Sequence, residues 1–336
     1  MVYAELPNQY RIVDLKQYNC VSSTMNVVDS VILYSTWNNK IVLRNLFTQK
    51  ILFEKKIGNL CYVKPVLNKN RLIIPLSDNT VACLDYKKDS ILWSFSIVKR
   101  CKNIIIVNDT VILVDVKHYG VVALNSQNGK KIYELLYDYN LCNLPDLSPY
   151  SMAVDNGHLY ISNWQCNALS CFNLGNGKLE WARNFGKLYY AGESVIKGDY
   201  LFIGMQSAYK DGKIVLLNKK DGSIVYERPY NYEEHRFARS TKSSIYFTTF
   251  TGTDNFSHLL CFNVISKTVD TIFSFNDSTD ISGSQFFLTD SAVIYTNFKN
   301  KVYIISLAEK RLKSYLLNNP ILLYMHKHNN EYFLFL

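Results

Sequence analysis

The sequence predicts an all-β fold, and three observations support this prediction. A segment made of an apolar strand, a polar turn and a strand with an aromatic residue occurs seven times. The chain is also rich in Tyr and Phe, which favour strands. The copies are evenly spaced, at 40, 40, 48, 45, 45 and 43 residues, with centres at Asn45, Asp85, Asn125, Asn173, Asn218, Asn263 and Ser306. A period of about 40–45 residues with several short strands per copy predicts a β-propeller.

Each copy divides into four strand-like runs separated by polar turns. In the second copy these runs are Tyr62–Leu67, Leu72–Leu76, Val81–Asp85 and Ile91–Phe95. The third strands of the other copies are expected at 41–45, 121–125, 169–173, 213–218, 259–263 and 302–306. The sequence therefore predicts seven complete four-stranded blades between about residue 21 and residue 317.

The two ends of the chain are expected to form one further blade between them. Pro320–His326 and Glu331–Leu336 are predicted as its first and second strands, and Val2–Leu6 and Tyr10–Leu15 as its third and fourth. Joining residues 2–15 to residues 320–336 keeps the period across the chain ends and removes an open sheet edge. We therefore predict a single propeller domain over residues 1–336 with eight four-stranded blades, and seven blades is the alternative.

The turn between the third and fourth strands has recurring residue types. In the third copy it runs from Asn125 to Lys130, with Gly129 before the lysine. Asn or Asp at the start of such a turn can bond the turn backbone, and Gly supplies a positive φ angle. An aromatic residue follows in the fourth strand, and we expect it to pack between adjacent blades. These aromatic residues are Phe53, Trp93, Tyr133, Trp181 and Tyr226.

The same order of residues resembles the repeat of the pyrroloquinoline-quinone-like β-propeller family. The best matches are Val122–Asn125 with Gly129, Lys130 and Tyr133, and Asn173 with Gly177, Lys178 and Trp181. Quinone-dependent enzymes of this family hold the quinone over a central Trp, with a calcium ion and a catalytic Asp, and many have a disulfide between adjacent cysteines. This sequence has no adjacent cysteines and no loop rich in Glu, Asn and Asp. We therefore expect a non-enzymatic member without a cofactor.

The other chemistry-bearing residues form no motif for catalysis or metal binding. His326 and His328 flank a predicted turn, but no acidic residue or cysteine completes a ligand spacing. A phosphate-binding loop and a nucleophile elbow are also missing from the sequence. Cys83, Cys171 and Cys261 occupy the repeat position of Ala123, which requires a small buried residue. We expect these cysteines to be reduced structural thiols.

Positive charge is concentrated in the first third of the chain. Residues 1–100 contain 14 Lys and Arg against 7 Asp and Glu, and the whole chain has a formal net charge of +9. Such a basic sector attracts an acidic protein, a nucleic acid or an anionic membrane. The simpler interpretation is that these lysines are solvated on strand edges and turns, where they also discourage edge pairing.

The sequence lacks the pattern of a secretion signal at its start and any run of about 18 apolar residues that would span a membrane. We therefore expect a cytoplasmic protein without a membrane span.

Long loops predict where a partner binds, because function concentrates on loops held by a rigid scaffold. In propellers, the loops between the second and third strands and the loops between blades share one face. The longest segments expected there are Leu136–Tyr150, Met205–Gly212, Arg228–Ser240 and Phe250–Ser257, and a shorter loop, Asn163–Asn167, presents Trp164. The candidate partner-binding residues on them are Tyr137, Tyr139, Tyr150, Trp164, Tyr209, Lys210, Tyr230, Tyr232, Glu233, Glu234, His235, Arg236, Phe237, Arg239 and Phe256.

Aromatic residues with both signs of charge suit a protein partner, whereas nucleic acid favours a basic groove with interleaved aromatics. We therefore predict a non-catalytic propeller, monomeric before it binds, that engages another protein through this long-loop face. One specific version is an immunity protein that neutralises a bacterial toxin. The alternatives are a scaffold or assembly subunit that uses the basic sector, and a propeller enzyme that binds a quinone or another small ligand in its central channel.

Overall fold

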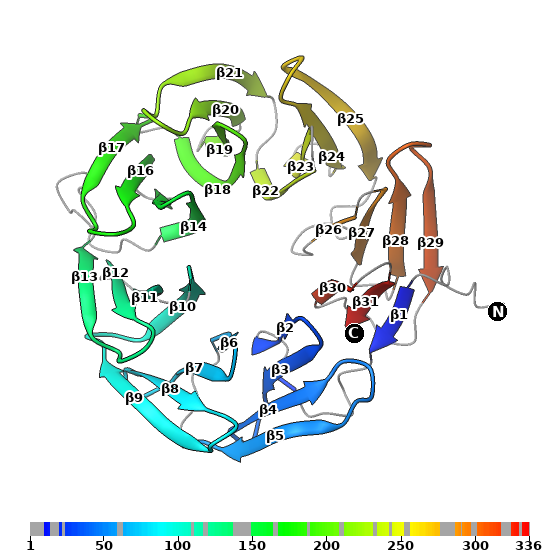
Figure 1. Cartoon of the computed structure of the whole chain (residues 1–336). Coiled ribbons are helices and arrows are strands. Elements are labelled where there is room, and N and C mark those ends of the chain that lie inside the picture. Colours follow the sequence, from blue (N-terminus) through cyan, green and yellow to red (C-terminus); the bar gives the residue numbers. More distant parts are fainter. Residues whose placement is uncertain are drawn as a thin grey trace. The chain divides into compact units, whose positions relative to one another are not determined.

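The computed structural model consists of β-strands joined by turns (Figure 1). It describes residues 10–13, 20–21, 24–58, 63–108, 111–116, 120–136, 149–163, 167–186, 189–207, 212–230, 234–241, 244–251, 256–275, 286–289, 291–296, 301–316, 324–328 and 331–335. These residues belong to two compact units. The terminal unit comprises the described residues within 7–138 and 323–336, and the middle unit those within 139–322.

The terminal unit contains four sheets. One joins β1 (Tyr10–Val13), β31 (Glu331–Phe335) and β30 (Tyr324–His328). The other three have four strands each, namely β2 (Asn26–Val28), β3 (Val31–Ser35), β4 (Lys40–Asn45) and β5 (Ile51–Lys56); β6 (Val66–Asn68), β7 (Arg71–Pro75), β8 (Thr80–Asp85) and β9 (Ser90–Ser96); and β10 (Cys101–Ile106), β11 (Val111–Val116), β12 (Gly120–Asn125) and β13 (Lys131–Leu136).

The middle unit contains four further four-stranded sheets. They are β14 (Pro149–Asp155), β15 (His158–Asn163), β16 (Ala168–Asn173) and β17 (Leu179–Asn184); β18 (Tyr189–Lys197), β19 (Tyr200–Ser207), β20 (Gly212–Asn218) and β21 (Ile224–Tyr230); β22 (Glu234–Ser240), β23 (Ser244–Thr251), β24 (Phe256–Asn263) and β25 (Thr268–Phe275); and β26 (Phe287–Leu288), β27 (Ala292–Thr296), β28 (Lys301–Ser306) and β29 (Leu312–Leu316). In all seven four-stranded sheets the strands pair in chain order, so the predicted positions of the third strands are confirmed.

The apolar core lies between consecutive sheets of a unit. One cluster joins Ile73, Cys83 and Trp93 of the β6–β9 sheet to Ile112 and Val122 of the next sheet. Second and third strands such as β3 and β8 are almost wholly buried, whereas the fourth strand at the sheet edge, such as β5, is largely exposed. Burial on both faces explains why the inner strands are continuous apolar runs in the sequence.

The turn between the third and fourth strands is built as its residue types predict. The side-chain oxygen of Asn45 accepts hydrogen bonds from the backbone N–H groups of Phe47 and Thr48 at 2.9 and 2.8 Å. Asp85 takes the same role in the next turn, and Asn70 also donates to its carboxylate at 2.9 Å. Burial acts to raise the pKa of Asp85, but these hydrogen bonds outweigh it and hold the pKa below its usual value.

Gly129 and Gly222 have a second role that the sequence did not indicate. Each has a positive φ, and each lies against a Trp ring of the preceding sheet, so that an added Cβ would come within 2.7 Å of Trp93 and 2.5 Å of Trp181, respectively. Both indole N–H groups donate to a carbonyl of the same turn, Trp93 to Ser126 and Trp181 to Lys219, at 3.0 Å. The predicted packing role of the two Trp residues is confirmed, and the glycine provides the room for it.

The sheet of the chain ends differs from the predicted strand order. Residues 2–6, the predicted third strand, lie outside the described residues. The predicted fourth strand, as β1, pairs directly with β31, and the pairing is parallel. This register sets Val13 opposite Phe335, and both side chains are buried in one cluster with residues of the β2–β5 sheet. The parallel register also brings Arg11 Nη2 within 2.6 Å of Glu331 Oε1.

The glycine–tryptophan contact predicts that Gly222→Ala destabilises the chain far more than Gly198→Ala. Both glycines have positive φ and lie in the middle unit, but only Gly222 contacts a Trp ring. We expect a loss of about 1–2 kcal/mol for Gly198→Ala from backbone strain and about 2–5 kcal/mol for Gly222→Ala from strain plus overpacking. Chemical denaturation measures both values. Equal losses would show that the Trp contact contributes nothing.

The sheet of the chain ends predicts a second difference in stability. Phe335 is fully buried, whereas Phe47 is 46% exposed and makes a T-shaped contact with Phe333. Phe335→Ala should therefore cost about 3–5 kcal/mol of unfolding free energy, and Phe47→Ala about 1 kcal/mol. Denaturation curves of the two variants test this difference, and wild-type stability of Phe335→Ala would contradict the buried position of β31.

Candidate protein-binding face

The antiparallel order brings two kinds of turn to the same end of the β2–β5 sheet and of the β6–β9 sheet. Lys40 at the start of β4 pairs with Lys56 at the end of β5, so the turn between β3 and β4 lies beside the exit from β5. The N–H of Ile57 donates to the carbonyl of Asn39 at 3.0 Å, and that of Ile97 donates to Asn79 at 2.8 Å. We call this end the turn face, made of residues 36–39, 57–58, 63–65, 76–79 and 97–100.

The turn face exposes side chains of the kinds that anchor protein interfaces. Trp37 is 60% exposed at the tip of the β3–β4 turn, and Val98 is 63% exposed after β9. Lys99 and Arg100 follow Val98 and are exposed as well. Trp and Arg are the residue types most enriched among interface hot spots. An aromatic anchor and a cationic group therefore lie at the same end of two consecutive sheets.

The Trp37 turn is held by its own hydrogen bonds. The Thr36 hydroxyl lies 2.5 Å from Asn38 Oδ1 and also accepts the N–H of Lys40 at 3.0 Å. The N–H of Asn39 donates to the carbonyl of Thr36 at 3.1 Å, and Asn39 has a φ of 60°. The indole is thus presented by a turn whose backbone conformation is set before any partner binds.

Charge on the turn face is mainly positive. Its described charged residues are Lys64, Asp78, Lys99 and Arg100, of which only Asp78 is acidic. Burial lowers the pKa of Lys64 on the connection between β5 and β6. With Lys99 and Arg100 exposed, the face suits an acidic partner.

Seven of the fifteen residues predicted to bind a partner lie outside the described residues: Tyr137, Tyr139, Trp164, Tyr209, Lys210, Tyr232 and Glu233. The other eight lie on strands: Tyr150 on β14, Tyr230 on β21, Glu234, His235, Arg236, Phe237 and Arg239 on β22, and Phe256 on β24. Among them only Arg239 has a described side chain, which donates to the carbonyl of Ala238 at 2.7 Å.

The prediction of long loops at Arg228–Ser240 and Phe250–Ser257 is therefore wrong. Only residues 231–233 separate β21 from β22, and only residues 252–255 separate β23 from β24. The charged run misled the prediction because β22 is the first strand of its sheet and pairs with β23 from Glu234 to Ser240 despite its polar side chains. Trp37 was missed because its turn is short, although a Trp between two strand-like runs is a usable signal.

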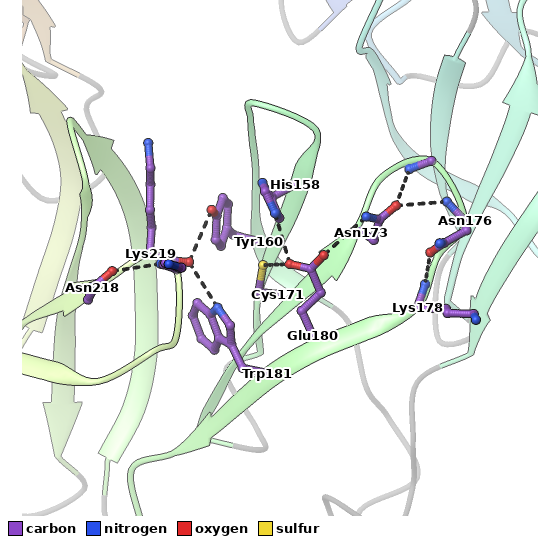
Figure 2. A network of polar contacts seen from close by, with 12 residues as sticks. His158, Tyr160, Cys171, Asn173, Asn176, Lys178, Glu180, Trp181, Asn218 and Lys219 are labelled. Atoms are coloured by element: carbon purple, nitrogen blue, oxygen red, sulfur yellow. Dashed lines mark hydrogen bonds and ion pairs between the residues drawn. The ribbon is translucent and has the colours of Figure 1, made fainter.

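Figure 2 shows a network of polar contacts in the middle unit that brings together His158, Cys171 and Glu180. His158 Nε2 lies 3.0 Å from one carboxylate oxygen of Glu180, and Cys171 Sγ lies 3.8 Å from the same oxygen. Burial, and then the charge of Glu180, raise the pKa of the Cys171 thiol to about 12. A thiol with this pKa stays protonated at neutral pH and is no nucleophile.

Another part of this network fastens two sheets together. The carbonyl of Lys219 accepts the Trp181 indole N–H, and its ammonium group lies 2.7 Å from Asp155 Oδ2 (Figure 2 shows the Trp181 contact). Tyr160 packs beside Trp181 with ring centroids 6.1 Å apart. The network therefore serves packing between the β14–β17 and β18–β21 sheets.

The described residues contain neither a metal-binding cluster nor a membrane-spanning helix. In that part of the chain, no three His, Cys, Asp or Glu side chains group so as to hold a metal ion. The same part contains no helix with the length and apolar character needed to cross a membrane.

The buried thiol gives a prediction about reactivity. In the folded chain at pH 7.5, alkylation of Cys171 by iodoacetamide should be at least about a hundredfold slower than in the unfolded chain, because the thiol is buried and protonated. Mass spectrometry of digested samples taken over time measures the rate at this one position. A folded-state rate within tenfold of the unfolded rate would contradict the buried, protonated state of the Cys171 thiol.

Comparisons with known proteins agree with this fold. A comparison with curated protein sequences finds no match. Three solved structures are similar to this chain over most of its length. Because their sequence identities are low, the similarity is evidence for a shared fold alone. BamB from Moraxella catarrhalis has a TM-score of 0.59 and 13% identity, and covers 86% of this chain and 82% of its own. The computationally designed Ika8 protein has a TM-score of 0.70 and 6% identity, with 91% and 90% covered.

The third structure, dihydro-heme d1 dehydrogenase NirN in complex with DHE, has a TM-score of 0.64 and 13% identity, with 88% and 67% covered. These similarities confirm the predicted all-β propeller, and the eight sheets agree with eight predicted blades. A family model described as outer membrane protein assembly factor BamB matches residues 13–228. That match spans more than half of the sequence, so the chain belongs to this family of pyrroloquinoline-quinone-like β-propellers.

Proposed function

We propose that this chain is a non-catalytic scaffold that binds another protein through the turn face of its terminal unit. The propeller fold is typical of protein-interaction scaffolds. Because one such fold hosts many functions, the evidence for a binding site has to come from the exposed residues. The observation that carries the proposal is Trp37, which is 60% exposed at the tip of a hydrogen-bonded turn.

Two physical arguments favour a protein partner for this face. A large aromatic side chain on a preorganised turn loses little conformational entropy when it is buried at an interface. Lys99 and Arg100, at the same end of the next sheet, are exposed, and together with the basic character of residues 1–100 they favour an acidic partner surface. The matched family model is described as an assembly factor, which also supports a scaffold role.

The sequence-based version of this hypothesis placed the binding residues elsewhere. In that version Tyr232, Arg236 and their neighbours contact the partner, which is a toxin that the chain neutralises. This remains the alternative within the same class of function. The cytoplasmic location and the monomeric state also remain predictions.

Affinity capture from the native cell lysate tests the proposal. We expect one stoichiometric partner for the wild-type chain, and a dissociation constant at least about tenfold higher for the Trp37→Ala/Arg100→Glu variant. Lys130→Glu is the matched control, because it reverses one exposed charge in the turn at the opposite end of the strands. Its affinity should stay within about twofold of wild type.

A second variant, Arg236→Glu/Tyr232→Ala, distinguishes the alternative. The partner could be lost with this variant and retained with Trp37→Ala/Arg100→Glu. That result would place the binding site at residues 228–240 and contradict binding through the turn face. A small toxin-like partner would then support neutralisation. Turnover of a purified quinone or another small ligand by the wild-type chain would contradict the non-catalytic role.

A further inference from the structure

The outer strands of the terminal unit share an irregularity just before the aromatic residue of the repeat. The register between β4 and β5 shifts between Leu43 and Arg44, so that Leu43 pairs with Phe53 and Arg44 with Ile51. The same shift in the next sheet pairs Cys83 with Trp93 and Leu84 with Ile91. Leu52 and Leu92 are the extra residues, and each marks a β-bulge on an edge strand.

These bulges expose two consecutive aliphatic residues where a regular strand would alternate. Ile51 and Leu52 are 51% and 49% exposed, and Ile91 and Leu92 are 66% and 42% exposed. On β13 the bulge residue Ile132 is 41% exposed. Beyond the bulge the fourth strand returns to alternation, as the pattern of β5 shows. We call Ile51, Leu52, Ile91 and Leu92 the bulge pairs.

The two bulge pairs lie on the outer strands of neighbouring sheets that contact each other. Lys55 near the end of β5 reaches Asp89, which precedes β9, with Nζ 2.6 Å from the carboxylate. The ring of Phe53 makes a T-shaped contact with Tyr86, which lies with Asp89 in the turn between β8 and β9, and the ring centroids are 6.1 Å apart. Figure 1 shows β5 and β9 following one another at the sheet edges. A single extended segment therefore has both pairs within reach.

Positive charge surrounds the bulge pairs. The acidic side chains Glu54 and Asp89 are paired, with Lys40 and Lys55, and Asp85 is buried. Exposed lysines remain on these strands and turns: Lys50, Lys56, Lys87 and Lys88. This surplus selects against a basic partner and favours an acidic one.

We propose that the bulge pairs dock an acidic protein segment that carries aliphatic or aromatic side chains. The segment is held by side-chain contacts and not by strand addition, because a bulge breaks the even row of backbone groups that an added strand requires. Its apolar residues cover the Ile and Leu side chains, and its carboxylates meet the surrounding lysines. This surface is distinct from the turn face, so either proposal can fail alone.

Peptide selection on the intact chain tests this docking surface. A library of 12-residue peptides displayed on phage is selected on the wild-type chain and counter-selected on the Ile91→Ser/Leu92→Ser variant. We expect enriched peptides that are acidic and contain Leu, Ile or Phe, with affinity at least about tenfold lower for that variant. Leu179→Ser is the matched control, since Leu179 is 53% exposed at the same strand position of the β14–β17 sheet.

Several outcomes would overturn the proposal. One is enrichment of neutral or basic peptides, and another is equal affinity for wild type and Ile91→Ser/Leu92→Ser. Failure to enrich any peptide over the counter-selection is a third. Co-sedimentation with phosphatidylserine vesicles that is lost with Ile91→Ser/Leu92→Ser would assign the surface to an anionic membrane instead. Circular dichroism of each variant confirms that the exposed substitutions leave the fold intact.

Discussion

The packing of one sheet onto the next depends on a large side chain that the fourth strand presents to the neighbouring turn. Where that side chain is Trp, its ring covers a glycine and its N–H satisfies a turn carbonyl, as at Trp93 and Gly129. The contact fixes the spacing of two sheets at a point where their strands form no backbone hydrogen bonds with each other. Each unit builds its core between such sheets. The conformation of the turn therefore determines how closely the side chains of two neighbouring sheets pack.

The fold was predictable because the signals repeat and are local. An Asn, Asp or Ser that bonds its own turn backbone, and an apolar run before it, identify the third strand in each copy without knowledge of the rest of the chain. The parallel pairing of β1 with β31 was not predictable in the same way. It joins residues more than three hundred positions apart, and no local turn specifies its register.

The candidate surfaces were less predictable because loop length is a poor guide to where strands end. Polar strand residues such as Glu234 and Arg236 pair with β23 as regularly as apolar ones do, so charge did not separate loop from strand. Trp37 lies on a short turn, and the criterion of length passed over it. The bulge pairs did have a signal in the sequence, since two aliphatic residues directly before the aromatic break the alternation of an edge strand.

One sheet of the middle unit shows that the fold does not require aliphatic residues at the bulge. The extra residue before Trp181 is Glu180, which binds His158 and Asn173 and keeps the same register shift. A charged residue is therefore compatible with the bulge and with the Trp contact that follows it. Since exposed Leu52 and Leu92 are not needed for this geometry, and since exposing them gains no burial energy, the proposed docking segment would give them a role that packing does not.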